Sequence, residues 1–457
     1  MITSQNQFRL IPSISLPWLI LFCAGTVPAQ QLFTKPAWWP QLSLGVSESY
    51  DDNLLGVSGL GLKPESSWIT KISPAIGFDF APLLGKEAPL QRLSLNYTPD
   101  FAMYHEAPSE NYDAHKFGAG IKGSAGQFSF SVDNSFLYND GSKIAPTYAL
   151  NQSGAASEFD KYRDVFGSAM ERERRNQVQE RETAVLQYDW DRAFLRATDA
   201  LLDYNLDTVW HNSKTAPYVG YQNYVDRSDV NGGVDLGYKV VTNLALTFGY
   251  RYGSQFQQRF PTSITTDSHY SSSTYQRGLL GVEGHPLHWL ELKMDGGPDF
   301  RDYNSHAPVA DLHPIKYYAE ATVKATITTN HSLTFNYKQW TWVFGSGLVP
   351  EFDSSYALNY HWNATSRLGF DLGAKIQEAD FTGGNDLTGP TAPSLRADRL
   401  YTIAPGVSYA LASQWSARLD YTYDAANNAL YTLPSADHAA YRNYIRNMGS
   451  LSMVFKF

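Results

Sequence analysis

The feature that most constrains this chain is an alternation of apolar and polar side chains that recurs in many separate segments. Over residues 92–101, every second side chain from Leu93 to Phe101 is apolar, and the side chains between them are polar. Successive side chains of a β-strand point to opposite faces, so this pattern predicts strands with one apolar and one polar face. The same alternation recurs at residues 229–240, 244–252, 290–295, 333–338, 368–376 and 418–424.

The length and spacing of these strands predict a membrane-spanning barrel. Many runs reach about ten residues, the length that a tilted transmembrane strand needs, whereas strands of soluble sandwiches are about half as long. Short connections such as 241–243 and 363–365 alternate with long ones such as 140–176 and 381–398. We therefore expect an all-β fold, a transmembrane antiparallel up-and-down β-barrel of about 18 strands with short periplasmic turns and long outer loops.

Charge and aromatic placement favour lipid, rather than a packed core, on the apolar faces. The polar faces are rich in charged side chains, which a water-filled lumen allows. Aromatic girdles mark the two interfaces of a membrane, and tryptophans stand beside several predicted turns: Trp190, Trp289, Trp362 and Trp415. The alternative is a soluble secreted β-protein, for example a carbohydrate-binding one.

The N-terminus carries an export signal. Residues 1–29 are typical of a signal peptide, with Arg9 as the charged residue, an apolar stretch from Leu10 and a cleavage site at residues 27–29. The apolar stretch is too short and too interrupted by proline for a spanning helix, which needs about 20 residues. A buried N-terminal strand or helix is the alternative. Residues 30–457 are then expected to form one domain, the outer-membrane β-barrel.

The last predicted strand ends in an aromatic residue. Leu451, Met453, Phe455 and Phe457 occupy every second position at the end of the chain. This pattern resembles the C-terminal strand by which the outer-membrane assembly machinery recognises barrels. We therefore expect that machinery and outer-membrane lipid as partners, and the cell outer membrane of a Gram-negative bacterium as the location.

Composition argues against several other classes of protein. With Lys+Arg 36 against Asp+Glu 45, a formal net charge of −9, the chain lacks a basic surface, so no nucleic acid is expected as a partner. The single cysteine, Cys23, lies in the expected leader, which leaves no thiol for disulfides, zinc binding or nucleophilic catalysis. No metalloprotease, phosphate-binding or serine-hydrolase motif occurs. We therefore predict neither an enzyme nor a cofactor.

The polar faces of the predicted strands supply the candidate functional residues. They carry charges of both signs, and rings of charged groups tune ion selectivity in channels. Because Asp199, Asp203 and Asp207 share one face of one strand, they form an acidic stripe from which we expect weak cation preference. The alternative is that such charges pair across strands and only keep the lumen wet. The expected pore-lining residues are Arg92, Asp100, Arg181, Asp199, Asp203, Asp207, Asp235, Lys239, Arg251, Glu291, Lys293, Lys338, Asp371, Lys375, Arg418 and Asp420.

Three further features allow either a functional or a structural interpretation. The longest loop, 140–176, either folds inward to narrow the pore, as the third loop of general porins often does, or stays outside it. Tyr318, Trp340 and Trp342 either form a stacking track for sugars or belong to the aromatic girdles. Residues 51–53, Asp-Asp-Asn, either bind a cation such as Ca²⁺ or form a turn at a strand end.

A family resemblance adds to this interpretation. Residues 43–54 read SLGVSESYDDNL, and a first strand that ends in this way resembles the start of the β-barrel porin type 2 family of outer-membrane proteins. Some members of that family are associated with exopolysaccharide clusters. The resemblance implies a porin-like channel for passive diffusion of small solutes or saccharides. The alternatives are a plugged structural or adhesive barrel, or a barrel associated with exopolysaccharide export.

Overall fold

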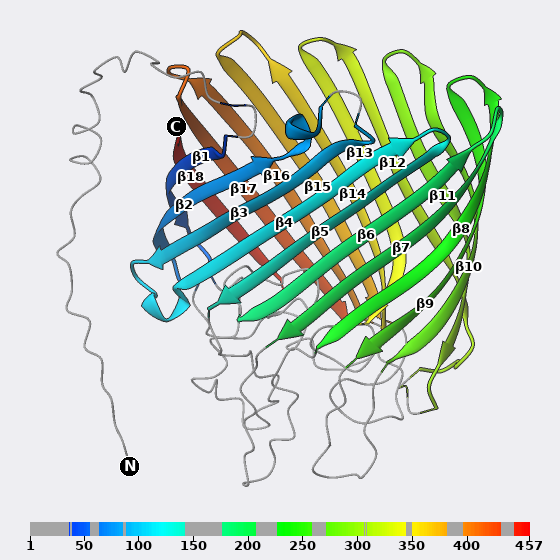
Figure 1. Ribbon diagram of the computed structural model, residues 1–457. Coiled ribbons are helices and arrows are strands. Elements are labelled where there is room, and N and C mark those ends of the chain that lie inside the picture. The colour runs from blue at the N-terminus through cyan, green and yellow to red at the C-terminus, as the bar shows by residue number, and fades with distance from the viewer. Residues whose placement is uncertain are drawn as a thin grey trace, which may run out of the picture.

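Within the residues that it describes, the computed structural model is a closed antiparallel β-barrel of 18 strands (Figure 1). Each strand pairs with its neighbours in the sequence, and β1 also pairs with β18, which closes the sheet. The predicted all-β up-and-down barrel is therefore confirmed. The described residues are 36, 39–54, 64–85, 88–141, 176–206, 226–257, 271–305, 307, 309–343, 350–381, 396–430 and 443–457. The signal peptide expected at residues 1–29 lies outside them.

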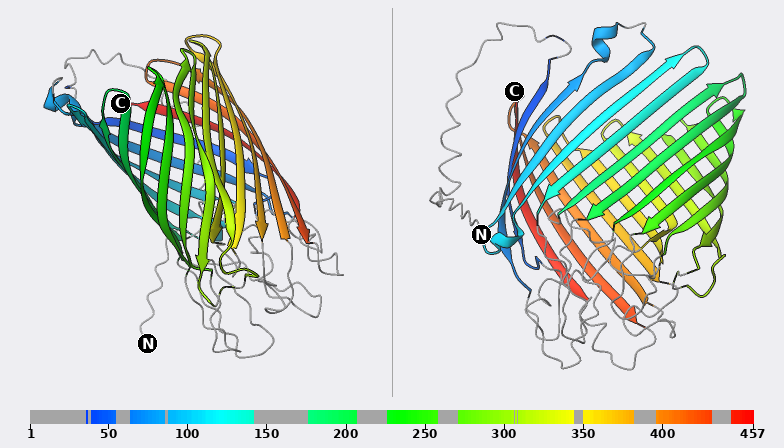
Figure 2. Two further views of the ribbon diagram at one scale, coloured as in Figure 1. Left: turned by 90° about the vertical axis from the view of Figure 1, so that its right-hand side faces the viewer. Right: turned by 60° about the horizontal axis from the view of Figure 1, so that its bottom comes forward.

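The strands are 11 to 16 residues long, enough to cross the apolar layer of a membrane when tilted. Figure 2 shows that they run obliquely around the wall. Their bounds are β1 (Gln41–Asp51), β2 (Ser67–Asp79), β3 (Leu90–Tyr104), β4 (Tyr112–Ala125), β5 (Phe128–Asp140), β6 (Gln177–Asp189), β7 (Ala193–Leu206), β8 (Arg227–Val241), β9 (Leu244–Gln257), β10 (Ser273–Leu287), β11 (Leu290–Tyr303), β12 (Ile315–Thr328), β13 (His331–Val343), β14 (Pro350–Asn363), β15 (Leu368–Phe381), β16 (Arg396–Ala410), β17 (Trp415–Leu430) and β18 (Tyr444–Lys456).

The connections differ between the two ends of the barrel. At the end where β1 begins and β18 stops, the upper end in Figure 1, most are tight, such as residues 126–127 and 242–243. Gly126 has a φ of +62° in the first of these turns, a backbone conformation that glycine adopts without steric cost. The β2–β3 connection at this end is longer and holds the 3-10 helix η1 (Ala81–Leu84).

At the opposite end the connections are longer, and most of their residues lie outside the described ranges. The β3–β4 connection is described and contains the 3-10 helix η2 (Pro108–Glu110). The predicted alternation of short and long connections is confirmed. No helix in the described part of the chain has the length and apolar character needed to cross a membrane.

The outward face of the barrel is apolar. Phe248 and Leu280 are 64% and 70% exposed, and similar side chains occupy alternate positions around the wall. Trp190, Trp289 and Trp362, beside the short turns, are also exposed, as an aromatic girdle at that end requires. In water such a surface would be unfavourable, so its natural surroundings are lipid.

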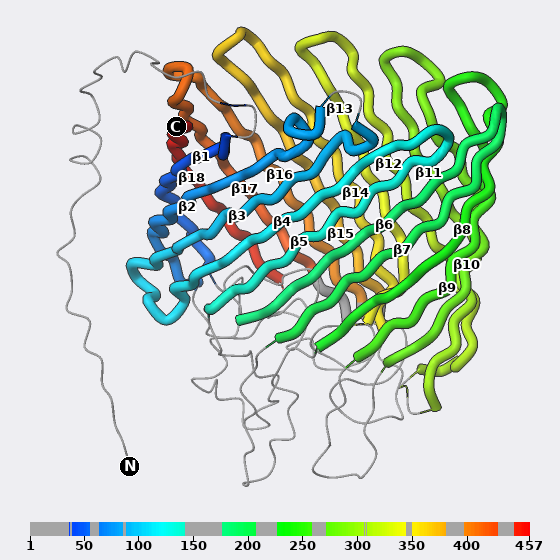
Figure 3. The backbone as a smooth tube through the Cα atoms, in the orientation of Figure 1, coloured from blue at the N-terminus to red at the C-terminus, as the bar shows by residue number. Residues whose placement is uncertain are grey.

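The first and last strands meet along a seam, the pairing of β1 with β18, where the blue and red ends of the tube adjoin in Figure 3. At the turn end, the Phe457 amide donates to the Leu42 carbonyl over 3.0 Å. At the loop end, Asp51 is fully buried and accepts hydrogen bonds from Arg446 Nε and Nη2, the shortest at 2.6 Å. The C-terminal residue therefore forms part of the closed sheet.

The two neighbours of Asp51 complete this contact. Asp52 accepts 2.7 Å hydrogen bonds from the backbone and side-chain nitrogens of Asn447, and the Asn53 amide group donates to the Ile445 carbonyl over 2.9 Å. Among the described residues, no group of His, Cys, Asp and Glu side chains could hold a metal ion. Protein donors thus occupy the Asp-Asp-Asn cluster, which supports the structural interpretation of residues 51–53 over the cation site.

Candidate functional site: a constricted, charged lumen

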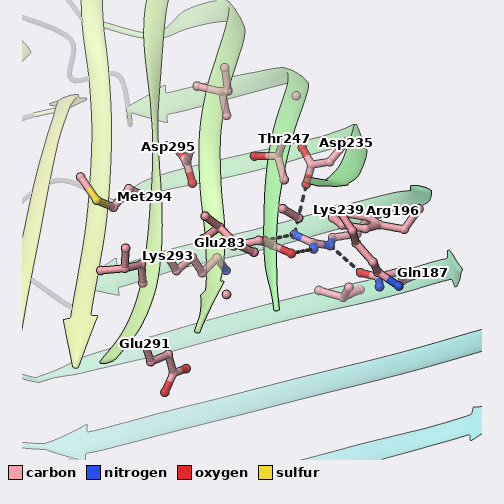
Figure 4. Close-up of a pocket in the computed structure, with 18 of the residues that line it drawn as sticks. Gln187, Arg196, Asp235, Lys239, Thr247, Glu283, Glu291, Lys293, Met294 and Asp295 are labelled. Atoms are coloured by element: carbon pink, nitrogen blue, oxygen red, sulfur yellow. Dashed lines mark hydrogen bonds and ion pairs between the residues drawn. The ribbon is translucent and has the colours of Figure 1, made fainter. Parts of the chain in front are cut away.

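Contacts between strands that are not neighbours identify the lumen side of the wall. Arg196 on β7 donates from Nη1 to Glu283 Oε2 on β10 over 3.0 Å (Figure 4), and Gln255 on β9 donates to the Thr341 carbonyl on β13 over 2.9 Å. Distant strands of a closed barrel meet only across its interior, so these side chains mark the inner face. Because side chains alternate between faces and paired residues share a face, the register assigns the remaining positions.

Near the short turns the inner wall encloses a cavity of about 520 Å³, the turn-side cavity. Its charged groups are largely paired: Arg251 Nη1 lies 2.6 Å from Asp235 Oδ1, and Lys239 Nζ lies 3.3 Å from Asp189 Oδ1. Arg196 lies between Glu283, Asp235 and Gln187 (Figure 4). Four basic and four acidic side chains line this cavity, so its formal charges cancel: Arg196, Lys239, Arg251, Lys293, Asp235, Glu283, Glu291 and Asp295.

A second cavity of about 830 Å³ adjoins the first, and the two share Arg251, Lys293 and Asp295 in their walls. This cavity lies nearer the long loops, and the ends of β13 and β14 form part of its lining. We call it the hairpin cavity. The two cavities together form a continuous charged surface along the inside of the barrel wall.

The paired ends of β13 and β14, residues 340–343 and 350–353, form what we call the inward hairpin, in which residues 340–343 lean into the lumen while residues 351–353 stay paired with β15. The pairing of β13 with β12 stops at Gln339 and Ala319, although β12 continues to Ile315. Beyond Gln339, the Thr341 carbonyl accepts hydrogen bonds from Gln255 on β9 and from Arg301 on β11, both at 2.9 Å. The end of β13 therefore parts from β12 and reaches β9 and β11, which narrows the barrel at its loop end.

A buried polar network holds the inward hairpin at its base. Arg301 has no exposed side-chain surface and donates from Nη1 to Gln255 Oε1 over 2.7 Å and from Nη2 to Asp299 Oδ2 over 3.2 Å. Gln255 Nε2 also donates to Asp229 over 2.8 Å, and the Tyr275 hydroxyl donates to the same carboxylate over 3.0 Å. The network joins β8, β9, β10 and β11 and fixes the donors that bind the hairpin backbone.

Aromatic contacts complete the anchoring of the hairpin. Arg227 on β8 donates to the Val343 carbonyl over 3.2 Å and lies over the rings of Tyr204 and Trp342. Trp342 is 3% exposed and stacks on Trp340, with ring centroids 4.7 Å apart. The other contacts of Trp340 come from Lys338, whose Nζ lies 4.2 Å from the ring centroid, and Asp353, which accepts a hydrogen bond from the indole.

These contacts bear on the two interpretations of the aromatic side chains. Trp342 is buried, Trp340 packs between Trp342 and Lys338, and Tyr318 covers one side of the Arg277 guanidinium at 4.3 Å. All three line the hairpin cavity on the inner face, and none lies in an outward girdle. The girdle interpretation is therefore wrong for these three side chains, and the sugar track stays a prediction.

Most of the expected pore-lining residues lie on the inner face, and many of them are paired. Asp100 accepts from Lys116 over 2.8 Å, Asp371 from Arg418 over 2.5 Å, and Arg418 also reaches Asp420 over 2.7 Å. The expected residues on the inner face are Arg92, Asp100, Arg181, Asp235, Lys239, Arg251, Glu291, Lys293, Lys338, Asp371, Lys375, Arg418 and Asp420.

The prediction that an acidic stripe on β7 faces the lumen is wrong. In the register of β7, Asp199 is opposite Ala184 and Gly232, and Asp203 is opposite Glu180 and Ser228, all on the outward face with Leu195. The strand has no clear alternation, since Leu201 and Leu202 are consecutive, and the contacts of Arg196 place the even-numbered positions inside. The basis for cation preference is thereby removed. Asp207 lies outside the described residues.

Sequence reasoning missed Arg196 in the turn-side cavity and the residues that hold the hairpin. Arg196, Arg227, Arg277, Arg301 and Asp299 were not among the expected lumen residues, although all lie on the inner face. Glu291 and Lys293 lie on the same face of β11 as Asp299 and Arg301. Following every second residue of this strand beyond Lys293 would therefore have predicted Asp299 and Arg301 as lumen residues. Most of the loop expected to constrict the pore, residues 142–175, lies outside the described ranges.

No family model matches this chain, and no curated protein matches it in sequence. Among solved structures it is similar to OccAB4 from Acinetobacter baumannii, with 13% identity over 93% of this chain and all of that chain at a TM-score of 0.41. It is also similar to the outer membrane protein OprD from Pseudomonas aeruginosa, with 12% identity over 92% and 93% of the two chains at a TM-score of 0.39.

A third similar structure is the siderophore receptor PirA from Acinetobacter baumannii, with 8% identity over 93% of this chain and 81% of that chain at a TM-score of 0.42. Likenesses at these TM-scores are too distant to carry an argument about this chain. Its function is therefore inferred from the geometry of its own barrel and lumen.

Proposed function

We propose that the chain is a porin-like channel in the outer membrane of a Gram-negative bacterium, through which small hydrophilic solutes diffuse passively. A closed barrel satisfies all backbone hydrogen bonds internally and can therefore cross a lipid layer. The apolar outward face and the exposed tryptophans beside the short turns support this placement. Cleavage after residue 29 and recognition of the strand ending at Phe457 by the assembly machinery belong to the same proposal.

The observation that carries the channel proposal is the lining of the lumen. Barrels of 16 to 18 strands enclose an aqueous space, and here charged side chains on nearly every strand face it. The adjoining turn-side and hairpin cavities offer room for hydrated solutes along one wall. The inward hairpin narrows this space and would set the upper size of a permeating solute.

A plugged or gated barrel is the second candidate, and the inward hairpin favours it. Three buried side chains, Gln255, Arg301 and Arg227, donate hydrogen bonds to backbone carbonyls of the hairpin and hold its described part in place. The resemblance of residues 43–54 to the β-barrel porin type 2 family is compatible with either candidate. Saccharides belong to the candidate solutes only through that resemblance.

Single-channel recording distinguishes the two candidates. The purified full-length product is inserted into a planar lipid bilayer, and the expected result is stable conductance steps. Inserted protein that passes no current would contradict the open channel and favour the plugged barrel.

A matched pair of tryptophan variants then tests the hairpin as the constriction. Trp342→Ala removes a ring that packs against Arg227 and Trp340, so the hairpin loosens and the conductance rises. Trp362→Ala removes an outward ring beside a short turn, so its conductance stays at the parent value. Equal conductance in all three proteins would place the constriction elsewhere.

A further inference from the structure

The hairpin cavity differs from the turn-side cavity in its charge. Its inward-facing lining holds seven basic side chains and four acidic ones, so basic side chains outnumber acidic ones by three. The acidic side chains are Asp229, Asp295, Glu320 and Asp353. Glu182 and Asp199 belong to strands of the same wall, but the register places their carboxylates on the outer face. The basic side chains that face the cavity are Arg181, Arg227, Arg251, Arg277, Lys293, Lys338 and Lys375.

Four of these cations form no ion pair with a described carboxylate, although Lys338 is opposite Glu320 in the register of β12 and β13. In the described part of the chain, no carboxylate lies within ion-pair distance of Arg181, Lys293, Lys338 or Lys375. The carboxylates of the cavity are better satisfied by neutral donors from the protein. Asp229, Glu320 and Asp353 accept hydrogen bonds from tyrosine, glutamine or tryptophan side chains: Tyr275, Gln255, Tyr318, Trp340 and Gln377.

The cations are also brought together by the fold. The charge of Lys338 on β13 acts on those of Arg181 on β6 and Arg277 on β10, as well as on the carboxylates of Glu320 and Asp229, although seven steps along the sheet separate β6 from β13. Arg277 is held rigidly, with its guanidinium 4.0 Å from the Tyr275 ring centroid and 4.3 Å from that of Tyr318. The repulsion among these groups is relieved most directly by an anion between them.

We propose that the hairpin cavity is a binding subsite for small anions, such as solutes that carry a carboxylate or a phosphate. Lys338, Lys375 and Arg181 supply cationic contacts, and Arg277 supplies a fixed guanidinium that matches the planar geometry of a carboxylate. The channel then prefers anions to cations, the reverse of what the acidic stripe suggested. This inference rests on the proposed channel function and names its solute class.

Reversal potentials in a KCl gradient test the inference. The parent channel is expected to pass chloride in preference to potassium. Lys375→Gln and the Lys338→Gln, Lys375→Gln double variant remove charge from the subsite. Each lost charge should lower the chloride-to-potassium permeability ratio roughly sevenfold, because a unit charge about 7 Å away in water changes the Boltzmann factors of the anion and of the cation about threefold each, in opposite directions.

Lys122→Gln is the matched control. It removes one positive charge from the inner face of β4, which contributes nothing to the hairpin cavity, and its permeability ratio should stay near the parent value. Glutarate and inorganic phosphate should block the parent current at lower concentrations than the double variant, and glucose should block neither. Block by glutarate but not by phosphate would assign the site to carboxylates, and the converse to phosphates.

The outcomes separate this inference from the channel proposal. A protein that inserts without conducting contradicts the proposed function. A conducting parent that prefers potassium, or subsite variants that shift no more than Lys122→Gln, would overturn the anion subsite and leave the channel standing. Because each record comes from a channel that has inserted and opened, misfolded variants cannot mimic either result.

Discussion

The inner walls formed by β8–β11 and by β2–β5 have the same strand geometry but hold their charges in different surroundings. On β11, Arg301 and Asp299 are almost completely buried beneath the inward hairpin. On β3 and β5, Arg92 pairs with Asp133 while 40% and 53% of their side-chain surfaces remain exposed. Gly118 and Gly120 on that second wall leave room for the side chains of Asn96 and Arg92, which lie over them.

The difference shows that the alternation of a strand determines which face a charged side chain points to, but not how much its ion pair contributes to stability. An exposed ion pair gains little because water screens it and competes for its hydrogen bonds. A buried pair is costly to break because removal of one partner leaves an uncompensated charge. The hairpin thus converts one wall into a rigid anchor and leaves the other as a hydrated surface.

The largest effect is expected from Arg301→Met. This change removes the buried hydrogen bonds from Arg301 to Asp299, to Gln255 and to the Thr341 carbonyl. Arg277 still donates to Asp299 and Gln255 to Thr341, but the loss of the Arg301 bonds should lower the free energy of unfolding by about 3–5 kcal/mol. Urea unfolding in detergent micelles measures it, and the released hairpin should also raise the single-channel conductance. A loss below about 1 kcal/mol, typical of an exposed pair, would break the comparison between the two walls.

Asp51→Asn tests whether burial alone, rather than the hairpin, makes a pair strong. Asp51 is fully buried on the open side of the barrel, at the seam, where Arg446 donates three hydrogen bonds to it. Loss of these charge-assisted bonds should cost about 1.5–3 kcal/mol in the same unfolding experiment. Unlike Arg301→Met, this variant should leave the conductance unchanged, and a conductance change would mean that the seam also shapes the pore.

Arg92→Met makes the same substitution on the hydrated wall. Because both partners of the Arg92–Asp133 pair are largely exposed, the expected loss of unfolding free energy is about 0–1 kcal/mol. The ratio of this loss to that of Arg301→Met measures how much burial beneath the hairpin adds to the stability contribution of the arginine. Equal losses would show that the two walls hold charge alike.

The smallest effect concerns Glu106 in the β3–β4 connection. The Trp68 amide donates to its carboxylate over 2.7 Å and the Ser67 hydroxyl over 2.9 Å, which holds the pKa of Glu106 below its ordinary value of 4.5. The folded state therefore binds fewer protons than the unfolded state. This stabilisation is complete above pH 4.5 and is lost as the pH falls through the lowered pKa.

The measurement is the pH dependence of the urea midpoint in the parent and in Glu106→Gln. The two proteins should converge as the pH falls below 4.5, because the parent loses the advantage of its charged carboxylate. A difference that is the same at pH 7 and at pH 3 would show that Glu106 acts by packing rather than by its charge.

The candidate site was predictable only where the sequence alternates clearly. Glu291 and Lys293 lie in a regular strand and face the lumen as expected. Asp199 and Asp203 lie in a strand with consecutive leucines, where a shift of one residue moves every side chain to the other face. No local signal distinguishes the two choices there, and the contact from Arg196 to Glu283 decides between them.

The sequence by itself determined the barrel, its approximate strand number, the ends that carry short and long connections, and the apolar character of the outward face. It could do so because strand period and turn length are local properties of the chain. Only the tertiary structure decided that the end of β13 parts from β12, that Arg301 and Gln255 bind its backbone, and that cations from β6, β10 and β13 share one cavity. These contacts join strands that are distant in sequence and meet only after the sheet has closed, so no local pattern can encode them.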